Sequence, residues 1–172
     1  GTHDIDLTAW LAGSPYVSIA AQTASRSGRE YEDLVAATGR LANGIVTNHL
    51  VNWLSPMKER LTVVTGERGA YVADTLSVDL TFYANGTLAN EWDSVANFRG
   101  VSEGDVTRFS LVKREPLRVE HEAFRDAVLG LRHDIVSLAE GLVTLRVAEG
   151  TVRSAKTGLP VLFTDAVGST AA

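Results

Sequence analysis

The stretch of sequence that decides the fold runs from Gly44 to Tyr83 and is GIVTNHLVNWLSPMKERLTVVTGERGAYVADTLSVDLTFY. Its first extended segment, residues 45–54, places alternate side chains on opposite faces, and a period of two residues is typical of a β-strand. Ser55-Pro56 ends this strand. One face carries Ile45, Thr47, His49, Val51 and Trp53, and the other carries Val46, Asn48, Leu50, Asn52 and Leu54.

The strand pattern continues through the rest of the stretch. Residues 61–65 form a β-branched run, and the glycines of the hairpin turn at residues 66–69 suit positive φ angles. Residues 70–73 then run back, residues 78–83 alternate again, and Asn85-Gly86 is a further turn signal. We therefore predict that the stretch forms the centre of one sheet, which needs a cover on at least one face.

The flanking sequence predicts helices that can supply this cover. Residues 2–13 indicate a short helix, with Thr2 as its N-cap and Gly13 at its end. Pro116 opens a second helix, and a capping box of Ser137 and Glu140 opens a third helix that ends at Gly158. The other predicted strands cover residues 16–23, 32–40, 106–112 and 159–163, with a hairpin turn at residues 41–44. This order predicts an α+β fold in which helices pack on one face of a mainly antiparallel open sheet.

The composition excludes several classes of protein. The formal net charge is −5, and the basic residues are scattered, so no basic patch indicates a nucleic-acid partner. No apolar run approaches the roughly 18 residues of a membrane span, and no signal-peptide pattern is present. The 172 residues contain no cysteine, which argues against a disulfide framework and a thiolate metal site. We expect one domain in a soluble, cytoplasmic protein.

Familiar catalytic and nucleotide-binding motifs are absent. The sequence contains neither G-x-G-x-x-G nor a Walker-type loop, so we expect no dinucleotide to bind to this chain alone in the usual way. It contains no G-x-S-x-G that would indicate a serine nucleophile. His3, Asp4 and Asp6 offer only two metal ligands on one helical face, and we therefore predict no metal site.

His3 is the titratable group with the clearest catalytic potential. A histidine at the start of a helix, with carboxylates at Asp4 and Asp6, can be oriented by one of them and act as a base near neutral pH. The residues alone also allow a plainer interpretation, in which His3 only caps the helix.

Four stretches in order resemble one family of oxidoreductases. GTHDIDL at residues 1–7 is similar to the second half of the D-x-G-x-H-x-x-D element of the glucose-fructose oxidoreductase, inositol dehydrogenase and MocA family, with Gly1, His3 and Asp6 at matching positions. Residues 53–69, residues 115–124 and the segment from Glu140 to Gly158 match the family in the same order. The resemblance runs from Gly1 to about Phe163.

The resemblance implies that residues 1–172 are the C-terminal substrate and oligomerisation domain of a two-domain oxidoreductase. An N-terminal Rossmann domain, which this chain does not contain, would bind NAD or NADP and supply the catalytic lysine. The aspartate expected two residues before Gly1 also lies outside the sequence. His3 would take the proton from a sugar hydroxyl while the carbon gives hydride to the nicotinamide, and Asp6 would support His3. We expect this chain alone to be inactive.

The segment after the first strand resembles the branch of the family that acts on nucleotide-linked amino sugars, such as UDP-N-acetylglucosamine 3-dehydrogenases. This resemblance implies that Trp53, Lys58 and Arg60 bind substrate. The two cations could meet phosphate or carboxylate, or they could belong to a solvated strand start. We expect His49 to be a sheet-face residue rather than a ligand, and His121 to be a packing residue.

The sequence is therefore compatible with two functions. The first is part of an NAD(P)-dependent dehydrogenase for a sugar or a nucleotide sugar. The second is a non-enzymatic module that uses its sheet for self-association or carbohydrate binding. In both, apolar side chains on both faces of residues 45–54 predict a homo-oligomer, a dimer or tetramer, formed through the open sheet face.

Overall fold

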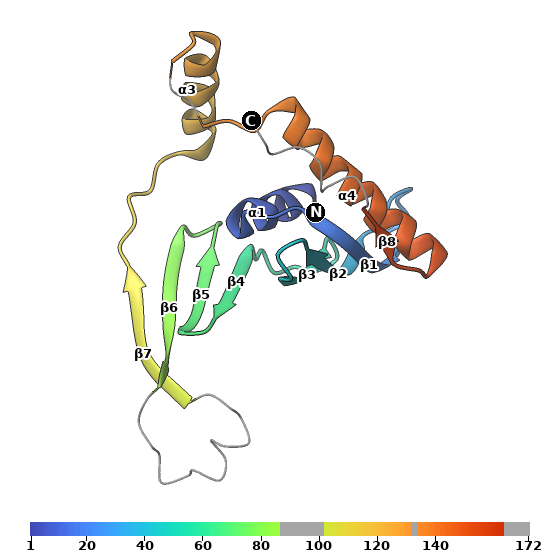
Figure 1. The fold of residues 1–172 in the computed structure, drawn as a ribbon, viewed down its shortest axis with the longest axis horizontal. Helices are drawn as coiled ribbons and strands as arrows, with labels where there is room; N and C mark the ends of the chain where they lie inside the picture. Colours follow the sequence, from blue (N-terminus) through green and yellow to red (C-terminus); the bar gives the residue numbers. More distant parts are fainter. Residues whose placement is uncertain (87–101, 132–133, 164–172) are drawn as a thin grey trace. The chain divides into compact units, whose positions relative to one another are not determined.

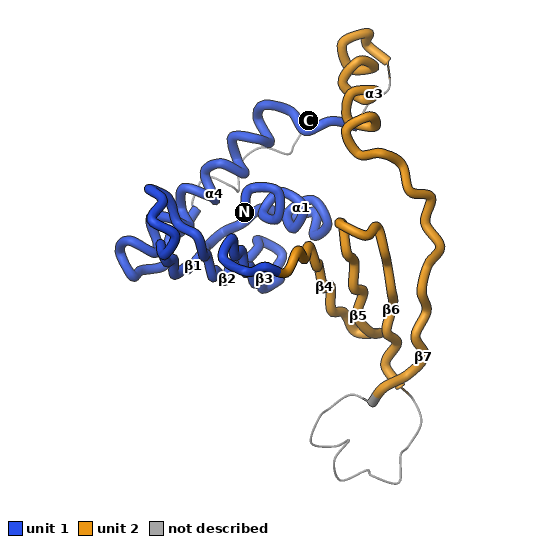
Figure 2. The backbone as a smooth tube through the Cα atoms, turned by 180° about the vertical axis from the view of Figure 1, so that it is seen from behind, with its two compact units in different colours: residues 1–56, 134–172 blue, residues 57–133 orange. Residues whose placement is uncertain are grey.

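The computed structural model describes residues 1–86, 102–131 and 134–163. The chain divides into two compact units (Figure 2). The first unit contains residues 1–56 together with the segment from residue 134 onward, and the second contains residues 57–133. Each unit has its own four-stranded antiparallel sheet.

The first unit places two helices on one face of its sheet (Figure 1). The strands follow the spatial order β3-β2-β1-β8. The last helix packs against β1 and against the first helix, so segments from both ends of the sequence cover the same sheet. The elements are α1 (Thr2–Ala12), β1 (Tyr16–Ala24), β2 (Leu34–Leu41), β3 (Val46–Asn52), α4 (Leu138–Thr157) and β8 (Val161–Leu162).

The strand register separates a covered face from an open face in this sheet. Ile19 pairs with Gly39, which pairs with Thr47, and Ala37 pairs with His49, so these side chains share the covered face. The core lies between this face and the two helices. It consists of Ile5, Tyr16, Ile19, Ala37, Leu41, Val147 and Val161. The open face carries Ser18, Ala20, Gln22, Ala36, Thr38, Arg40, Val46, Asn48, Leu50 and Leu162.

The second unit is built on strands in the order β4-β5-β6-β7. Gly66 pairs with Gly69, so a tight turn joins β4 to β5, and Gly69 has a φ of 147°, which favours glycine. The ring of Tyr71 lies on one face of this sheet, and its centroid is 4.6 Å from the ring centroid of Phe82 and 6.3 Å from that of Phe109. The elements are β4 (Leu61–Gly66), β5 (Gly69–Asp74), β6 (Asp79–Gly86), β7 (Ser102–Phe109) and α3 (Pro116–Val128).

The structure confirms the predicted α+β fold class with antiparallel strands. The capping box of Ser137 and Glu140 opens α4, and Gly13 and Gly158 end α1 and α4 in the left-handed conformation that glycine favours. Pro116 opens α3 as predicted. No helix in the described ranges is long and apolar enough to cross a membrane.

Four details of the prediction are wrong. His121 is not a packing residue, because it is exposed on α3, a helix without any buried residue. The stretch from Gly44 to Tyr83 does not form one sheet, because β3 belongs to the first unit and β4, β5 and β6 belong to the second. Asn85-Gly86 is not a turn, since both residues extend β6 and pair with β7. Gly1, not Thr2, is the N-cap of α1, and no side chain caps that helix.

Candidate functional site

Helix α1 carries the two residues that the sequence singled out for catalysis. His3 is exposed in the first turn. Asp6 is half-buried one turn later, where its Oδ1 accepts a hydrogen bond of 3.0 Å from Thr144 Oγ1 on α4. Asp6 therefore links α1 to α4. Within the described residues no hydrogen bond joins Asp6 to His3, so support of His3 by Asp6 stays a prediction.

A cavity of about 180 Å³ lies beside the first turn of α1, and we call it the α1 cavity. All of its lining residues belong to the first unit. His3 directly follows two of them in the sequence, Gly1 and Thr2. Trp53, although 72% exposed, contributes to the lining, as we expect of a substrate-binding residue. The lining residues are Gly1, Thr2, Ile5, Ile19, Glu32, Asp33, Val35, Ala37, His49, Val51, Trp53, Ala148, Thr151 and Val152.

His49 lies on the covered face of β3, and its polar side chain is part of the lining of the α1 cavity. The Tyr16 hydroxyl lies 2.8 Å from His49 Nε2 in a hydrogen bond. Burial lowers the pKa of His49, and burial also raises the pKa of Tyr16, so both groups are held in their neutral forms near neutral pH. The sequence offered one signal for this pair, because Thr47 and His49 are polar positions on a face that is otherwise apolar. The partner on β1 could not be identified before the strand pairing was known.

Gly39 makes room for the Tyr16 ring. A Cβ atom at residue 39 would lie 2.6 Å from Tyr16 Cε1 and 2.8 Å from Thr47 Oγ1. Tyr16 is only 3% exposed, so its ring is enclosed between β2 and the rest of the core. The hydroxyl of Tyr16 is thereby fixed at His49.

A loop anchored by Asp33 borders the cavity. The Asp33 carboxylate accepts hydrogen bonds from the Ser27 hydroxyl at 2.6 Å, the Arg26 N–H at 2.6 Å and the Ser27 N–H at 2.8 Å. The Ser27 hydroxyl and then the two N–H groups lower the pKa of Asp33 to about 2. Asp33 is therefore ionised at neutral pH, and its hydrogen bonds hold residues 26 and 27 near the start of β2.

Lys58 and Arg60 follow Trp53 but belong to the second unit, where both are exposed. The Arg60 carbonyl accepts a hydrogen bond of 3.1 Å from the Thr75 N–H, which fixes the backbone at the start of β4. The structure brings Trp53 to the α1 cavity together with His49. It does not place Lys58 and Arg60 relative to His3, so their contact with substrate stays a prediction.

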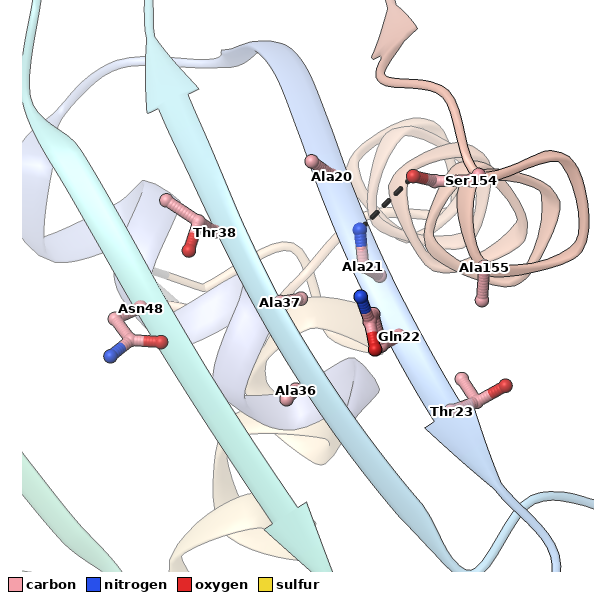
Figure 3. Close-up of a pocket in the computed structure, with 11 residues that line it drawn as sticks. Ala20, Ala21, Gln22, Thr23, Ala36, Ala37, Thr38, Asn48, Ser154 and Ala155 are labelled. Atoms are coloured by element: carbon pink, nitrogen blue, oxygen red, sulfur yellow. Dashed lines mark hydrogen bonds between the residues drawn. The ribbon is translucent and has the colours of Figure 1, made fainter.

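The open face of the first sheet has a shallow hollow over the small side chains of Ala20 and Ala36 (Figure 3). Gln22, Thr38 and Asn48 add amide and hydroxyl groups to it. At its edge, the Ala21 N–H donates a hydrogen bond of 3.0 Å to Ser154 Oγ, where α4 passes beside β1. No aromatic side chain lines the hollow. The α1 cavity, which has Trp53, is therefore the better candidate for binding a sugar ring.

The sequence motifs for a dinucleotide and a metal ion can be checked against the described residues. The glycine turn at residues 66–69 joins two antiparallel strands, so it does not deliver a phosphate to a helix N-terminus. No group of three histidine or acidic side chains in these residues could hold a metal ion.

Comparison with known protein families identifies the fold. Residues 1–163 match the family described as the oxidoreductase family, C-terminal alpha/beta domain, of the glucose-fructose oxidoreductase, inositol dehydrogenase and MocA proteins. The chain belongs to this family. The match begins at the helix that carries His3 and ends at the residue after β8, so it includes both units.

Solved structures agree with this assignment at low sequence identity. UDP-N-acetylglucosamine 3-dehydrogenase from Acidithiobacillus ferrooxidans is 23% identical, with a TM-score of 0.74 over 91% of this chain and 47% of that protein. The WlbA dehydrogenase from Bordetella pertussis, in complex with NADH and UDP-GlcNAcA, is 24% identical, with a TM-score of 0.63 over 94% of this chain and 43% of that protein. Aldose-aldose oxidoreductase from Caulobacter crescentus, complexed with glycerol, is 17% identical, with a TM-score of 0.71 over 95% of this chain and 46% of that protein.

These likenesses concern the fold. The chain spans about half the length of the solved relatives, from 43% to 47% in these three. A comparison with curated proteins found no match.

Proposed function

We propose that this chain is the substrate-binding and oligomerisation domain of an NAD(P)-dependent sugar dehydrogenase, with His3 as its general base. The observation that carries the proposal is the position of His3 in the first turn of α1, directly after two residues that line the α1 cavity. Family membership supports redox chemistry. The printed substrates and ligands of the relatives support a sugar or a nucleotide sugar.

His3 would act on the hydroxyl group of the sugar. An imidazole can act as a general base, and the removal of the hydroxyl proton turns the alcohol into a carbonyl as hydride leaves its carbon. NAD or NADP, held by a Rossmann domain of the whole protein, would accept the hydride. Asp6 would hold α1 in place through Thr144 and thereby fix the position of His3.

Trp53 would provide an apolar surface for the sugar ring. The flat face of an indole packs well against C–H groups, and Trp53 contributes to the α1 cavity. Lys58 and Arg60 would bind the phosphates if the substrate is a nucleotide sugar. Substitution of either cation by Gln should then weaken binding of UDP-N-acetylglucosamine and leave binding of a free aldose unchanged.

The test of the proposed function uses the whole protein. UDP-N-acetylglucosamine and glucose are offered with NAD⁺ and NADP⁺, and the reduced cofactor is measured by absorbance. We expect turnover of at least one sugar, and His3→Ala should lower kcat by roughly 10²–10⁴-fold, because a positioned base contributes that much.

His121→Ala is the matched control, since His121 is exposed on α3 and contributes nothing to the cavity lining. Turnover by His3→Ala at the normal rate would refute the assignment of the base. A whole protein without any cofactor-binding domain would instead favour the non-enzymatic module.

We also propose that the domain assembles into a dimer or tetramer through its open sheet face. Leu50 is 73% exposed on that face, and Val46 and Leu162 add exposed apolar surface to it. The whole protein should sediment as an oligomer at high micromolar concentration. Leu50→Glu should lower the mass of the sedimenting species toward that of the monomer. Leu11→Glu, on α1, is the control. A wild type that stays monomeric would contradict the proposal.

A further inference from the structure

We propose that His49 is a second substrate-binding residue, which hydrogen-bonds a hydroxyl group of a neutral sugar ring in the α1 cavity, and that Tyr16 is its positioning residue. The inference rests on the proposed function and names a contact that neither the sequence pattern nor the family match assigns. The expectation from the sequence was that His49 is a sheet-face residue rather than a ligand.

The first step is the geometry of the imidazole. His49 lies on the covered face of β3 and lines the cavity together with Val51 and Trp53. Its Nε2 is bonded to Tyr16, whose ring is enclosed in the core. In the described part of the chain the other ring nitrogen, Nδ1, has no hydrogen-bond partner. Nδ1 is not among the buried polar atoms that lack a partner, so it is accessible, and a hydroxyl group of a ligand in the cavity can form a hydrogen bond with it.

The second step is the charge of the cavity. Burial lowers the pKa of His49, so the ring is neutral near pH 7 and offers one donor nitrogen and one acceptor nitrogen. The charged groups at the cavity are the carboxylates of Glu32 and Asp33 and the amino group of Gly1, and the Asp4 carboxylate also acts on His49. Neither lysine nor arginine is among its lining residues. The carboxylates outnumber the one amino group and therefore disfavour an anionic ligand, whereas a sugar hydroxyl can donate or accept and fits either tautomer of His49.

The third step is the size of the cavity. At about 180 Å³ it is smaller than the roughly 300–1,000 Å³ of a pocket for a drug-sized ligand. It therefore suits one ring and not a complete nucleotide sugar. With a nucleotide sugar as substrate, the sugar would enter the α1 cavity while the phosphates stay outside it, away from the carboxylates.

The test measures kcat and KM in the whole protein, with UDP-N-acetylglucosamine and glucose as the sugars. His49→Ala should raise KM for the sugar substrate about fivefold, because one neutral hydrogen bond is lost, and should change kcat little. His49→Gln retains a donor and an acceptor and should restore part of the lost affinity. Tyr16→Phe should raise KM less than His49→Ala does.

A double variant separates positioning from stability. Because Tyr16 acts through His49, Tyr16→Phe should have no further effect on KM in the His49→Ala background. Val161→Ala is the structural control. Val161 is buried in the same core but does not line the cavity, so this change should lower Tm and leave KM unchanged.

The outcomes distinguish this inference from the proposed function. An unchanged KM in His49→Ala, with His3→Ala still inactive, would overturn the inference and leave the proposed function intact. An additive effect of the two substitutions on KM would overturn the role of Tyr16. Absence of turnover by the wild type with both sugars and both cofactors would overturn the proposed function and this inference with it.

Discussion

The two sheets of the protein have the same number of strands and the same antiparallel pairing, yet among the described residues only the sheet of the first unit packs against a hydrophobic core. In the first unit α1 and α4 cover one face, and every buried hydrophobic side chain among the described residues belongs to this unit. In the second unit Gly69 is buried, but no described hydrophobic side chain is. Strand pairing alone therefore does not exclude water, and the cover of a sheet decides which unit is stabilised by burial.

The largest effect should come from a matched pair of leucine substitutions, one in each sheet. Leu41 is 1% exposed at the end of β2, and Leu61 is 56% exposed at the start of β4. Leu41→Ala should lower the free energy of unfolding of the first unit by about 3–5 kcal/mol, because it leaves a cavity in the core. Leu61→Ala should cost less than about 1 kcal/mol in the second unit.

Site-resolved hydrogen exchange in urea can follow the two units separately. An equal loss of free energy of unfolding in the two variants would contradict the difference between the two units, since it would mean that Leu61 is packed as tightly as Leu41 in the folded protein.

The second prediction uses acid to test the first unit. The pKa of Asp33 is lowered from 3.8 to about 2 by the Ser27 hydroxyl and by two backbone N–H groups. A lowered pKa in the folded state stabilises the protein above the unfolded pKa, and this contribution is lost as the pH falls from about 4 toward 2. Urea unfolding at several pH values should therefore show declining stability of the first unit in that window.

Asp33→Asn should remove most of this decline, because the amide does not take up a proton in this pH window. Glu30→Gln, in the same loop, is the control, since Glu30 makes no hydrogen bond or ion pair among the described residues. If the acid profile of Asp33→Asn matched that of the wild type, the loop anchor would have no role in acid stability.

The sequence predicted the side-chain faces of β3 correctly, because the alternation of residues 45–54 is a local property. It also predicted the ends of α4, where Ser137, Glu140 and Gly158 act through contacts within a few residues. The division into two sheets was missed because alternation does not state which strand pairs with which. Asn85-Gly86 is a strong turn signal, and pairing with β7 overrides it.

The candidate site was predictable to a similar extent. The resemblance pointed to His3, Asp6 and Trp53, and the structure then placed Trp53 at the α1 cavity. The bond between Tyr16 and His49 joins residues 33 positions apart, and it exists because β1 pairs with β2 and β2 with β3. Such a contact follows from strand register, so the sequence alone gave no means to identify it.

The smallest effects should come from removal of the N-terminal caps of α3 and α4, and the effect on stability should differ between these two helices. Ser137 Oγ accepts a hydrogen bond from the Glu140 N–H at the start of α4, which contributes Val147, Thr151 and Ser154 to the buried interior. Ser137→Ala should therefore lower the free energy of unfolding by about 1 kcal/mol. The Glu115 carboxylate caps α3 through the Leu117 and Arg118 N–H groups, but α3 has no buried residue.

Glu115→Ala should accelerate hydrogen exchange within residues 116–128 and change the free energy of unfolding by less than about 0.5 kcal/mol. The reason is that a helix without buried contacts can fray while the rest of the chain stays folded. If Glu115→Ala proved as costly as Ser137→Ala, then α3 would contribute to the folded core through its apolar stripe. The stripe of Leu117, Phe124 and Val128, exposed here, would then have a partner in the folded protein.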